Sequence, residues 1–310
     1  MLLGGFRKWQ KVGNTGVATV TEWIAGARPR TLPNSVVPVA VGTGVALGAT
    51  PGGAAWWKAG LALLVALSLQ IGVNYANDYS DGVRGTDADR VGPTRLTAAR
   101  RAPPRRVFVA AWIGFAVAAL AGLVLVATTS WWLLVLGVAA IAAAWTYTGG
   151  SSPYGYRALG EVSVFLFFGV AAVVGTAFVQ VWPQESVPWA GWVAAVSVGL
   201  LSCAVLVVNN LRDIPTDAAT GKRTLAVVLG DARTRWLYVG CVAGAFVFSL
   251  VTVAVSWWVA LVVLAVPLSV RPCVRVLRGA TGSELVQQLG ETGRLQLAFG
   301  ALYALGLALG

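Results

Sequence analysis

The stretch VNYANDYSDGVRGTD, residues 73–87, follows a long apolar run and has a counterpart in VVNNLRDIPTDAATG at 207–221. Both segments contain the pattern Val-Asn-x-x-x-Asp, and the two copies lie 135 residues apart. The 310 residues include only 12 Asp and Glu, and half of them belong to these regions: Asp78, Asp81, Asp87, Asp89, Asp213 and Asp217. This concentration of carboxylates in an apolar chain indicates a functional site.

The composition predicts a membrane protein. Hydrophobic residues make up 57% of the chain and charged residues 11%, whereas a soluble domain has about 25% charged residues. A helix needs ~20 apolar residues to cross a bilayer, and runs near that length recur along the chain. We therefore expect a single all-α bundle of nine transmembrane helices, at 32–49, 56–76, 107–128, 131–148, 159–181, 189–208, 236–255, 257–272 and 294–309.

The two ends of this bundle differ in charge. Of the 23 Lys and Arg residues, 22 lie before the first span or in the connections after even-numbered spans, which leaves only Lys58 on the other side. The positive-inside rule makes the motif-bearing face cytoplasmic, with the N-terminus inside and the C-terminus outside. The net charge of +11 therefore needs no nucleic-acid partner, because topology and attraction to anionic membrane lipid explain it.

The N-terminal segment, the absence of histidine and the positions of tryptophan give further information on domains, chemistry and topology. Residues 1–22 are expected to form a cytoplasmic tail, since they contain no apolar stretch long enough for a signal peptide, and residues 23–310 form the bundle. Histidine is absent, which excludes His-based catalysis and His-ligated zinc or haem. Tryptophans cluster at the predicted outer ends of the spans, as expected for a membrane interface: Trp56, Trp57, Trp131, Trp132, Trp182, Trp189, Trp192, Trp257 and Trp258.

Both motifs have helical spacing. A helix that continues past residue 76 places Asn74, Asn77, Asp78 and Asp81 on one face, and Asn209, Asp213 and Asp217 repeat every four residues in the second motif. Carboxylates stacked in this way repel one another unless a cation neutralises them, and oxygen ligands suit Mg²⁺. Cations near the motifs indicate that the metal is shared with a diphosphate: Arg84, Arg212, Lys222 and Arg223. Alternatively, the carboxylates only pair with neighbouring arginines on a solvated loop.

The second and sixth spans run in the same direction, which suggests a weak parallel repeat whose two motifs meet in one cytoplasmic cavity. An ion-coupled transporter is one alternative, because buried carboxylates also mark ion pathways. The spans are not visibly broken, however, and the carboxylates lie at their ends rather than at mid-membrane. A purely structural lipid-binding protein would leave both Asp clusters without a role.

Four segments resemble the membrane-embedded aromatic prenyltransferases of the UbiA type, and within them the 1,4-dihydroxy-2-naphthoate branch. They are ARPRTLPNSVVPV at 27–39, NDYSDGVRGTD at 77–87, YTGGSSPYGYRALGE at 147–161 and NNLRDIPTDAATGKRTLAV at 209–227. The resemblance extends over nearly everything from residue 23 onward. It implies a multi-pass enzyme of the bacterial cell membrane that uses Mg²⁺. That enzyme would transfer a polyprenyl group from its diphosphate to 1,4-dihydroxy-2-naphthoate with decarboxylation, giving demethylmenaquinone and diphosphate.

The resemblance also assigns roles to individual residues. Asn77, Asp78 and Asp81 match its first Asp-rich motif, and Asp213 and Asp217 match the second, which makes them the metal ligands and the catalytic carboxylates. Asn74, Asn209 and the four cations named above are expected to hold the diphosphate. Asp87 matches the late Asp of the naphthoate branch, but other branches place an Asp at the position of Gly85, so its role as a ligand stays open.

Other assignments each have a structural alternative. Tyr147 matches a Tyr placed near the reacting allylic carbon in similar enzymes, or it is simply an interfacial Tyr. Arg28 or Arg30 could pair with the acceptor carboxylate, or both could anchor the helix at the membrane surface. Glu161 could contact the acceptor or cap a helix N-terminus. The acceptor itself could instead be 4-hydroxybenzoate, homogentisate, haem, chlorophyllide or a sugar phosphate donor.

Overall fold

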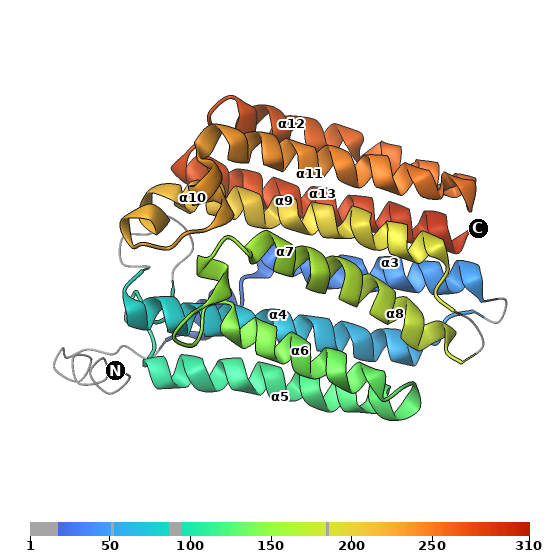
Figure 1. Ribbon diagram of the computed structural model, residues 1–310, viewed down its shortest axis with the longest axis horizontal. Coiled ribbons are helices and arrows are strands. Elements are labelled where there is room, and N and C mark those ends of the chain that lie inside the picture. Colours follow the sequence, from blue (N-terminus) through green and yellow to red (C-terminus); the bar gives the residue numbers. More distant parts are fainter. Residues whose placement is uncertain (1–17, 51–52, 87–94, 184–185) are drawn as a thin grey trace.

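The computed structural model describes residues 18–50, 53–86, 95–183 and 186–310. Within these ranges every regular element is a helix, so the all-α class is confirmed (Figure 1). Residues 1–17 of the predicted tail, together with Asp87 and Asp89, lie outside the described residues. The α-helices are α2 (Val20–Gly26), α3 (Pro33–Ala49), α4 (Trp56–Arg84), α5 (Pro104–Thr128), α6 (Trp132–Thr146), α7 (Gly160–Val164), α8 (Ala172–Val181), α9 (Trp189–Ala219), α10 (Leu225–Leu229), α11 (Asp231–Val251), α12 (Val266–Leu277) and α13 (Gly282–Ala308).

Short helices of other types connect or extend these elements. A π-helix, η3 (Phe165–Ala171), joins α7 to α8 into one segment, Gly160–Val181. The 3₁₀ helices are η1 (Pro29–Thr31), η2 (Tyr154–Tyr156), η4 (Thr252–Ala254) and η5 (Trp257–Ala265). By length and composition, six described segments can cross a membrane, or seven if the pair Val20–Thr31 and Pro33–Ala49, bent by 50°, is one span.

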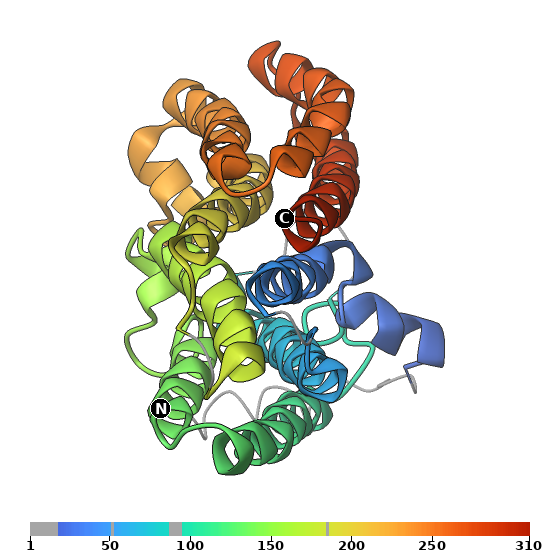
Figure 2. The same ribbon diagram turned by 90° about the vertical axis from the view of Figure 1, so that its right-hand side faces the viewer.

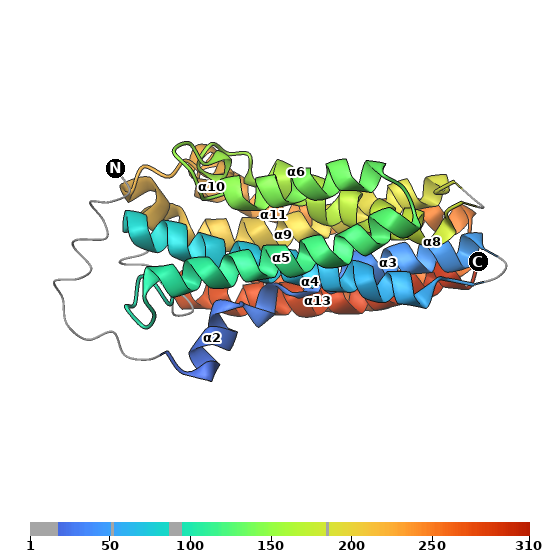
Figure 3. The ribbon, with the colours of Figure 1, turned by 90° about the horizontal axis from the view of Figure 1, so that it is seen from below.

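The two motif-bearing helices, α4 and α9, are longer than the predicted spans. They contain 29 and 31 residues, and each continues through its Asp motif, which confirms the helical arrangement of the carboxylates. Both run in the same direction and finish at the end of the molecule that carries α10, whereas the C-terminus lies at the opposite end (Figure 1). The helix α2 lies beside the motif end, outside the main bundle (Figure 3).

The surface at the other end is rich in tryptophan. All nine tryptophans expected at the outer ends of the spans are exposed, from 37% for Trp258 to 79% for Trp132. Indole rings at a helix end, exposed to the surroundings, suit a membrane interface because they combine a polar N–H with a large apolar body.

Pairs of long helices build the bundle. Helix α4 packs on α5, α9 on α11, and α3 on α13. Viewed from its end, the molecule has α3 and α9 between a group formed by α11, α12 and α13 and a group formed by α4, α5 and α6 (Figure 2). Buried Val, Leu and aromatic side chains of α3, α9, α11 and α13 form the largest apolar core.

Glycine allows η3 to approach α9 closely. A Cβ atom placed on Gly169 would lie 2.6 Å from the Cα atom of Gly199 and 2.7 Å from the backbone oxygen of Ala195. Neither contact is possible for real atoms without movement of one helix. The two glycines therefore set the spacing at which the α7–η3–α8 segment and α9 enclose a cavity.

The substitution Gly169→Ala is expected to destabilise the bundle by about 1–3 kcal/mol, the usual effect of overfilling a close contact. The apparent melting temperature in detergent should fall. Gly240→Ala in α11 is the matched control, because in the described residues no atom outside the nearby backbone of its own helix lies within 4 Å of a Cβ at that position. An unchanged melting temperature for Gly169→Ala would show that the two helices separate without strain.

Candidate functional site

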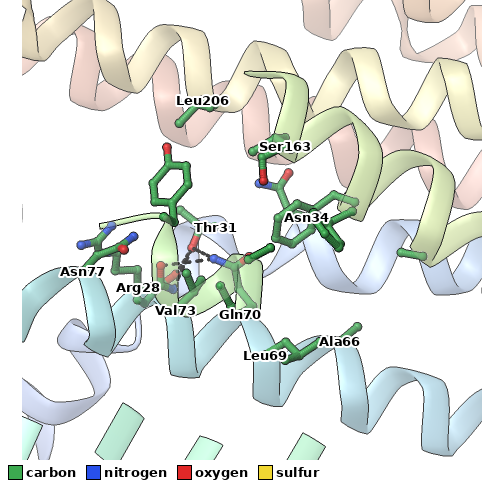
Figure 4. A pocket seen from close by; sticks show the side chains of 18 of the residues that line it. Arg28, Thr31, Asn34, Ala66, Leu69, Gln70, Val73, Asn77, Ser163 and Leu206 are labelled. Carbon is green, nitrogen blue, oxygen red and sulfur yellow. Dashed lines mark hydrogen bonds between the residues drawn. The ribbon is translucent and has the colours of Figure 1, made fainter. Parts of the chain in front are cut away.

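A cavity of about 780 Å³ extends from the motif end into the bundle. Its walls come from α3, α4, α5, α6, the α7–η3–α8 segment, α9 and the start of α13 (Figure 4). Residues of both Asp motifs line its mouth, whereas Val, Leu, Phe and Ala side chains line most of the remainder. One end therefore suits a charged group and the other an apolar chain.

Asp81 contacts one hydroxyl group and two cations. It is 2% exposed, and its Oδ1 atom accepts a hydrogen bond of 2.7 Å from the hydroxyl of Tyr156. Its Oδ2 atom lies 3.9 Å from Nη2 of Arg95 and 3.9 Å from Nζ of Lys222. Burial, and then the negative charge of Asp81, raises the pKa of Tyr156 well above its ordinary value, so this hydroxyl remains a hydrogen-bond donor.

Lys222 connects the two motifs. Its Nζ atom lies 3.6 Å from Oδ1 of Asp217 as well as 3.9 Å from Oδ2 of Asp81. Its ammonium also lies 5.2 Å from the centre of the Tyr156 ring, close enough for a cation–π contact. One cation is thus held between carboxylates from α4 and α9, which confirms that the motifs meet in space.

This arrangement fits a magnesium site. The Lys222 ammonium stands where the charges of Asp81 and Asp217 converge, so these oxygens can share a cation. No group of three Asp, Glu, Cys or His side chains in the described ranges is close enough to enclose a metal by itself. Mg²⁺ commonly binds one or two carboxylates and takes its other ligands from water and substrate phosphates, so two carboxylates suffice.

Asp78 has a different environment from Asp81. It is 1% exposed, and its two oxygens accept hydrogen bonds from the backbone N–H groups of Leu96, at 2.7 Å, and Thr97, at 2.8 Å. It therefore anchors the turn that follows residue 95 to α4. Because Arg95 directly precedes this turn, Asp78 also positions the guanidinium that faces Asp81.

Within the second motif, Arg212 pairs with Asp213. The Arg212 guanidinium donates from Nε and Nη2 to the two oxygens of Asp213, each at 2.7 Å, and from Nη2 to Oδ1 of Asn209 at 2.9 Å. All three residues line the cavity. The bidentate contact fixes the plane of the guanidinium at the edge of the cavity mouth.

Two of the cations expected at the diphosphate, Arg84 and Arg223, do not line the cavity. Arg84 donates to the backbone oxygens of Thr148 and Gly150, and does not line the cavity. Arg223 is exposed, and its backbone pairs with Tyr156 and Ala158. Arg84 connects the end of α4 to the loop after α6, and the backbone of Arg223 connects the segment after α9 to the same loop. The spacing of residues in the sequence does not reveal these contacts.

The two asparagines of the first motif also have protein partners. Asn77 accepts a hydrogen bond of 2.6 Å from Thr148 Oγ1 through its Oδ1 atom. Asn74 donates from Nδ2 to the backbone oxygen of Ala27, at 2.8 Å, and to Thr31 Oγ1, at 3.3 Å. Both line the cavity, so they form its wall while holding neighbouring segments in place.

Tyrosines and a buried Glu flank the middle of the cavity. Tyr147 and Tyr154 line it and pack edge to face, with ring centres 5.4 Å apart. Glu161 lies behind this wall, 8% exposed, and its Oε1 atom accepts a hydrogen bond of 3.0 Å from Asn210 Nδ2. Glu161 therefore orients an amide that does line the cavity. Arg28 and Arg30 also belong to the lining, with Arg30 exposed.

Sequence reasoning missed several residues of this site. Arg95 stands out in sequence only as one of many loop cations, and no spacing rule links Tyr156 to Asp81, which precedes it by 75 positions. Asn210 directly follows a motif residue, but only the structure shows its contact with Glu161. A polar residue inside an otherwise apolar run is the sequence signal that can identify cavity-lining residues. Gln70 and Asn34 in the cavity wall are examples.

Comparisons with known proteins agree with this architecture. The sequence profile of the UbiA prenyltransferase family matches residues 35–287. The 1,4-dihydroxy-2-naphthoate octaprenyltransferase of Mycobacterium tuberculosis is 52% identical over 95% of this chain and 99% of its own length. The enzyme of the same name from Escherichia coli is 36% identical over 94% of this chain and 97% of its own.

Solved structures show the same fold at low identity. A UbiA homologue from Aeropyrum pernix has a TM-score of 0.66 at 18% identity, covering 87% of this chain and 96% of that one. A UbiA homologue from Archaeoglobus fulgidus, bound to DMAPP and Mg²⁺, has a TM-score of 0.62 at 16% identity, covering 91% and 99%.

Proposed function

The chain belongs to the UbiA prenyltransferase family, and we propose that it transfers a polyprenyl group from polyprenyl diphosphate to 1,4-dihydroxy-2-naphthoate. The acceptor loses its carboxyl group as carbon dioxide, and the products are diphosphate and the prenylated 1,4-diol, which is the reduced form of demethylmenaquinone in menaquinone biosynthesis; oxidation to the quinone is a separate, later step. Identity of 50% or more to named naphthoate enzymes over almost the whole chain supports this choice of acceptor. The structural observation that carries the proposal is the convergence of Asp81 and Asp217 on one cation at the mouth of a largely apolar cavity.

We assign the magnesium to Asp81 and Asp217, with Asn77 beside them. When bound, Mg²⁺ neutralises the charge that develops on the departing diphosphate. Asp78 and Asp213 each have other partners, so we assign them the tasks of holding the turn at Leu96 and Thr97 and of orienting Arg212, in place of the direct ligation expected from the sequence.

Cations around the mouth of the cavity bind the diphosphate. Three cations line the cavity: Arg95 from the segment after α4, Arg212 from α9, and Lys222 from the segment after α9. Asn209 supports Arg212 through its hydrogen bond. We assign Arg84, Arg223 and Asn74 to holding the surrounding loops and α2 region rather than to direct contact with phosphate.

The remaining lining residues serve the reacting carbons. The allylic cation formed when the carbon–oxygen bond breaks needs an environment without water, which the Leu, Val and Phe wall supplies. The face of Tyr147 stabilises positive charge through its π electrons. We assign Arg28 and Arg30, which line the cavity, to the acceptor carboxylate, and Glu161 to holding the Asn210 amide at the cavity wall.

We propose nine membrane crossings in all, with the N-terminus and the site in the cytoplasm and the C-terminus outside. The 22 Lys and Arg residues on the motif face and the exposed tryptophans at the other end support this orientation. The protein would then be a multi-pass component of the bacterial cell membrane, with its prenyl donor drawn from the surrounding lipid.

A turnover assay on detergent-solubilised protein tests the proposal. Labelled geranylgeranyl or farnesyl diphosphate is supplied with either 1,4-dihydroxy-2-naphthoate or 4-hydroxybenzoate, with and without Mg²⁺. We expect magnesium-dependent product from the naphthoate alone. Product from 4-hydroxybenzoate instead would keep the chemistry and overturn the acceptor, whereas no product from either would overturn the assignment and favour the transporter alternative.

A further inference from the structure

A polar patch lies within the cavity, deeper along α4 than the Asp motif. Gln70 of α4 and Asn34 of α3 both line the cavity there and are 5% and 7% exposed (Figure 4). Their side-chain oxygens, Oε1 and Oδ1, have no hydrogen-bond partner among the described residues. An unsatisfied buried carbonyl oxygen is unfavourable unless a ligand or water supplies a donor.

The orientation of the Gln70 amide is dictated by its neighbours. The backbone oxygen of Ala27 can only accept, so Asn74 must present its NH₂ group there and turn its Oδ1 atom toward Gln70. Gln70 must then present its own NH₂ group to Asn74, at 3.2 Å, and this group is also 3.4 Å from Thr31 Oγ1. Thr31 in turn donates its hydroxyl proton to the backbone oxygen of Arg28. Among the residues that the structure describes, the Oε1 atom is therefore the part of Gln70 left without a partner.

Location distinguishes Gln70 from other glutamines. Gln180, Gln288 and Gln296 also have side-chain oxygens without a partner in the described part of the chain, but none of these residues lines the cavity. Gln70 lies eight residues before Asp78 on α4, which corresponds to about 12 Å along the helix at 1.5 Å per residue. A group bound at Gln70 thus lies beyond the diphosphate, at the depth where the reacting ring belongs.

We propose that Gln70 Oε1 accepts a hydrogen bond from a ring hydroxyl of the aromatic acceptor. This inference rests on the proposed function and identifies a residue that selects the acceptor. Neither the diphosphate nor the acceptor carboxylate carries a donor at neutral pH, and the prenyl chain has no polar group at all. The hydroxyls of the diol are the donors that the two substrates bring. A hydroxyl that donates to a carbonyl oxygen also makes its ring more electron-rich, which favours attack on the allylic carbon.

The variant Gln70→Met tests the proposal, because Met has nearly the same shape and no amide. We expect the KM for 1,4-dihydroxy-2-naphthoate to rise about tenfold, the effect of one buried hydrogen bond, with the KM for the prenyl diphosphate unchanged. Gln180→Met is the matched control, since it removes a buried glutamine with an unpartnered oxygen outside the cavity. It should leave both KM values as they are.

Inhibition by monohydroxy naphthoates makes the test specific. 1-Hydroxy-2-naphthoate and 4-hydroxy-2-naphthoate each lack one hydroxyl, and we expect Gln70→Met to weaken only the inhibitor that retains the contacted one. Equal weakening of both, or a parallel rise in the KM for the prenyl diphosphate, would indicate a purely structural role and overturn the inference. If the Gln70→Met variant does not insert into the membrane, Gln70→Asn is the second variant. It withdraws the carbonyl by one methylene and should produce the same selective rise in the KM for the naphthoate.

Measurements on the wild-type protein distinguish failure of this inference from failure of the proposed function. Wild-type turnover of the naphthoate with unchanged kinetics in the Gln70 variants would overturn the inference alone. Absence of any wild-type turnover or binding of the naphthoate would overturn both.

Discussion

The substitution Asp81→Asn is expected to lower turnover about 10³-fold, corresponding to the several kcal/mol that a bound metal contributes to stabilising a developing negative charge. Asn has the same shape as Asp and can still accept the Tyr156 hydrogen bond, so the variant keeps this contact and removes the negative charge that faces Arg95 and Lys222. Asp217→Asn should have a similar effect, because Asp217 faces the same cation from α9. The measurement is the rate of prenyl transfer at saturating substrate across a range of Mg²⁺ concentrations.

Three further measurements test whether the effect is specific to the carboxylate pair. The concentration of Mg²⁺ that gives half-maximal rate should rise in each variant. The double variant should be little worse than either single one, because the two groups act as a unit. Glu284→Gln, at an exposed position of α13 outside the cavity, should retain full activity. Retention of a tenth or more of the parent rate by Asp81→Asn would refute the assignment of Asp81 to the metal.

Much of the fold can be predicted from the sequence, because it depends on properties that are periodic. Apolar length predicts the membrane helices, and the spacing of Asn77, Asp78 and Asp81 predicts one helical face, as α4 shows by continuing to Arg84. The parallel course of α4 and α9 follows from the charge alternation of the loops and brings both motifs to one end (Figure 1). Composition alone, however, qualifies only six or seven of the described segments as spans.

The site is harder to predict, because its contacts join residues that are distant in sequence. Tyr156 reaches Asp81, and Lys222 reaches both Asp81 and Asp217, only after α6 and α9 have packed. The π-helical turn at Phe165–Ala171 likewise contains Gly169, whose close approach to α9 is a tertiary contact that no local propensity encodes. Sequence patterns therefore identify which residue types carry the chemistry, whereas tertiary packing decides which of them contact one another.

Asp78 is a residue whose type is predicted from the sequence but whose contacts are not, and its substitution is expected to have the second large effect. The motif places Asp78 and Asp81 as equivalent carboxylates, but the structure gives Asp78 two backbone donors, the N–H groups of Leu96 and Thr97. In Asp78→Asn one of the two oxygens becomes an NH₂ group that faces an N–H donor. Hydrogen bonds to a charged group contribute about 1.5–3 kcal/mol each, so we expect a loss of stability of about 2–3 kcal/mol together with loss of activity.

Thermal melting and limited proteolysis in detergent, without substrate or metal, distinguish Asp78 from Asp81. Asp78→Asn should melt at a lower temperature than the parent and be cleaved faster near Leu96, because the turn is no longer anchored. Asp81→Asn should melt closer to the parent, since its hydrogen bond from Tyr156 survives and Lys222 keeps its contact with Asp217. If Asp78→Asn instead melts like the parent yet loses all turnover, Asp78 acts on the substrate or metal directly, and the anchoring role assigned to it is wrong. Lower stability combined with partial activity that recovers at reduced temperature would establish that Asp78 serves the site by holding Arg95 in place.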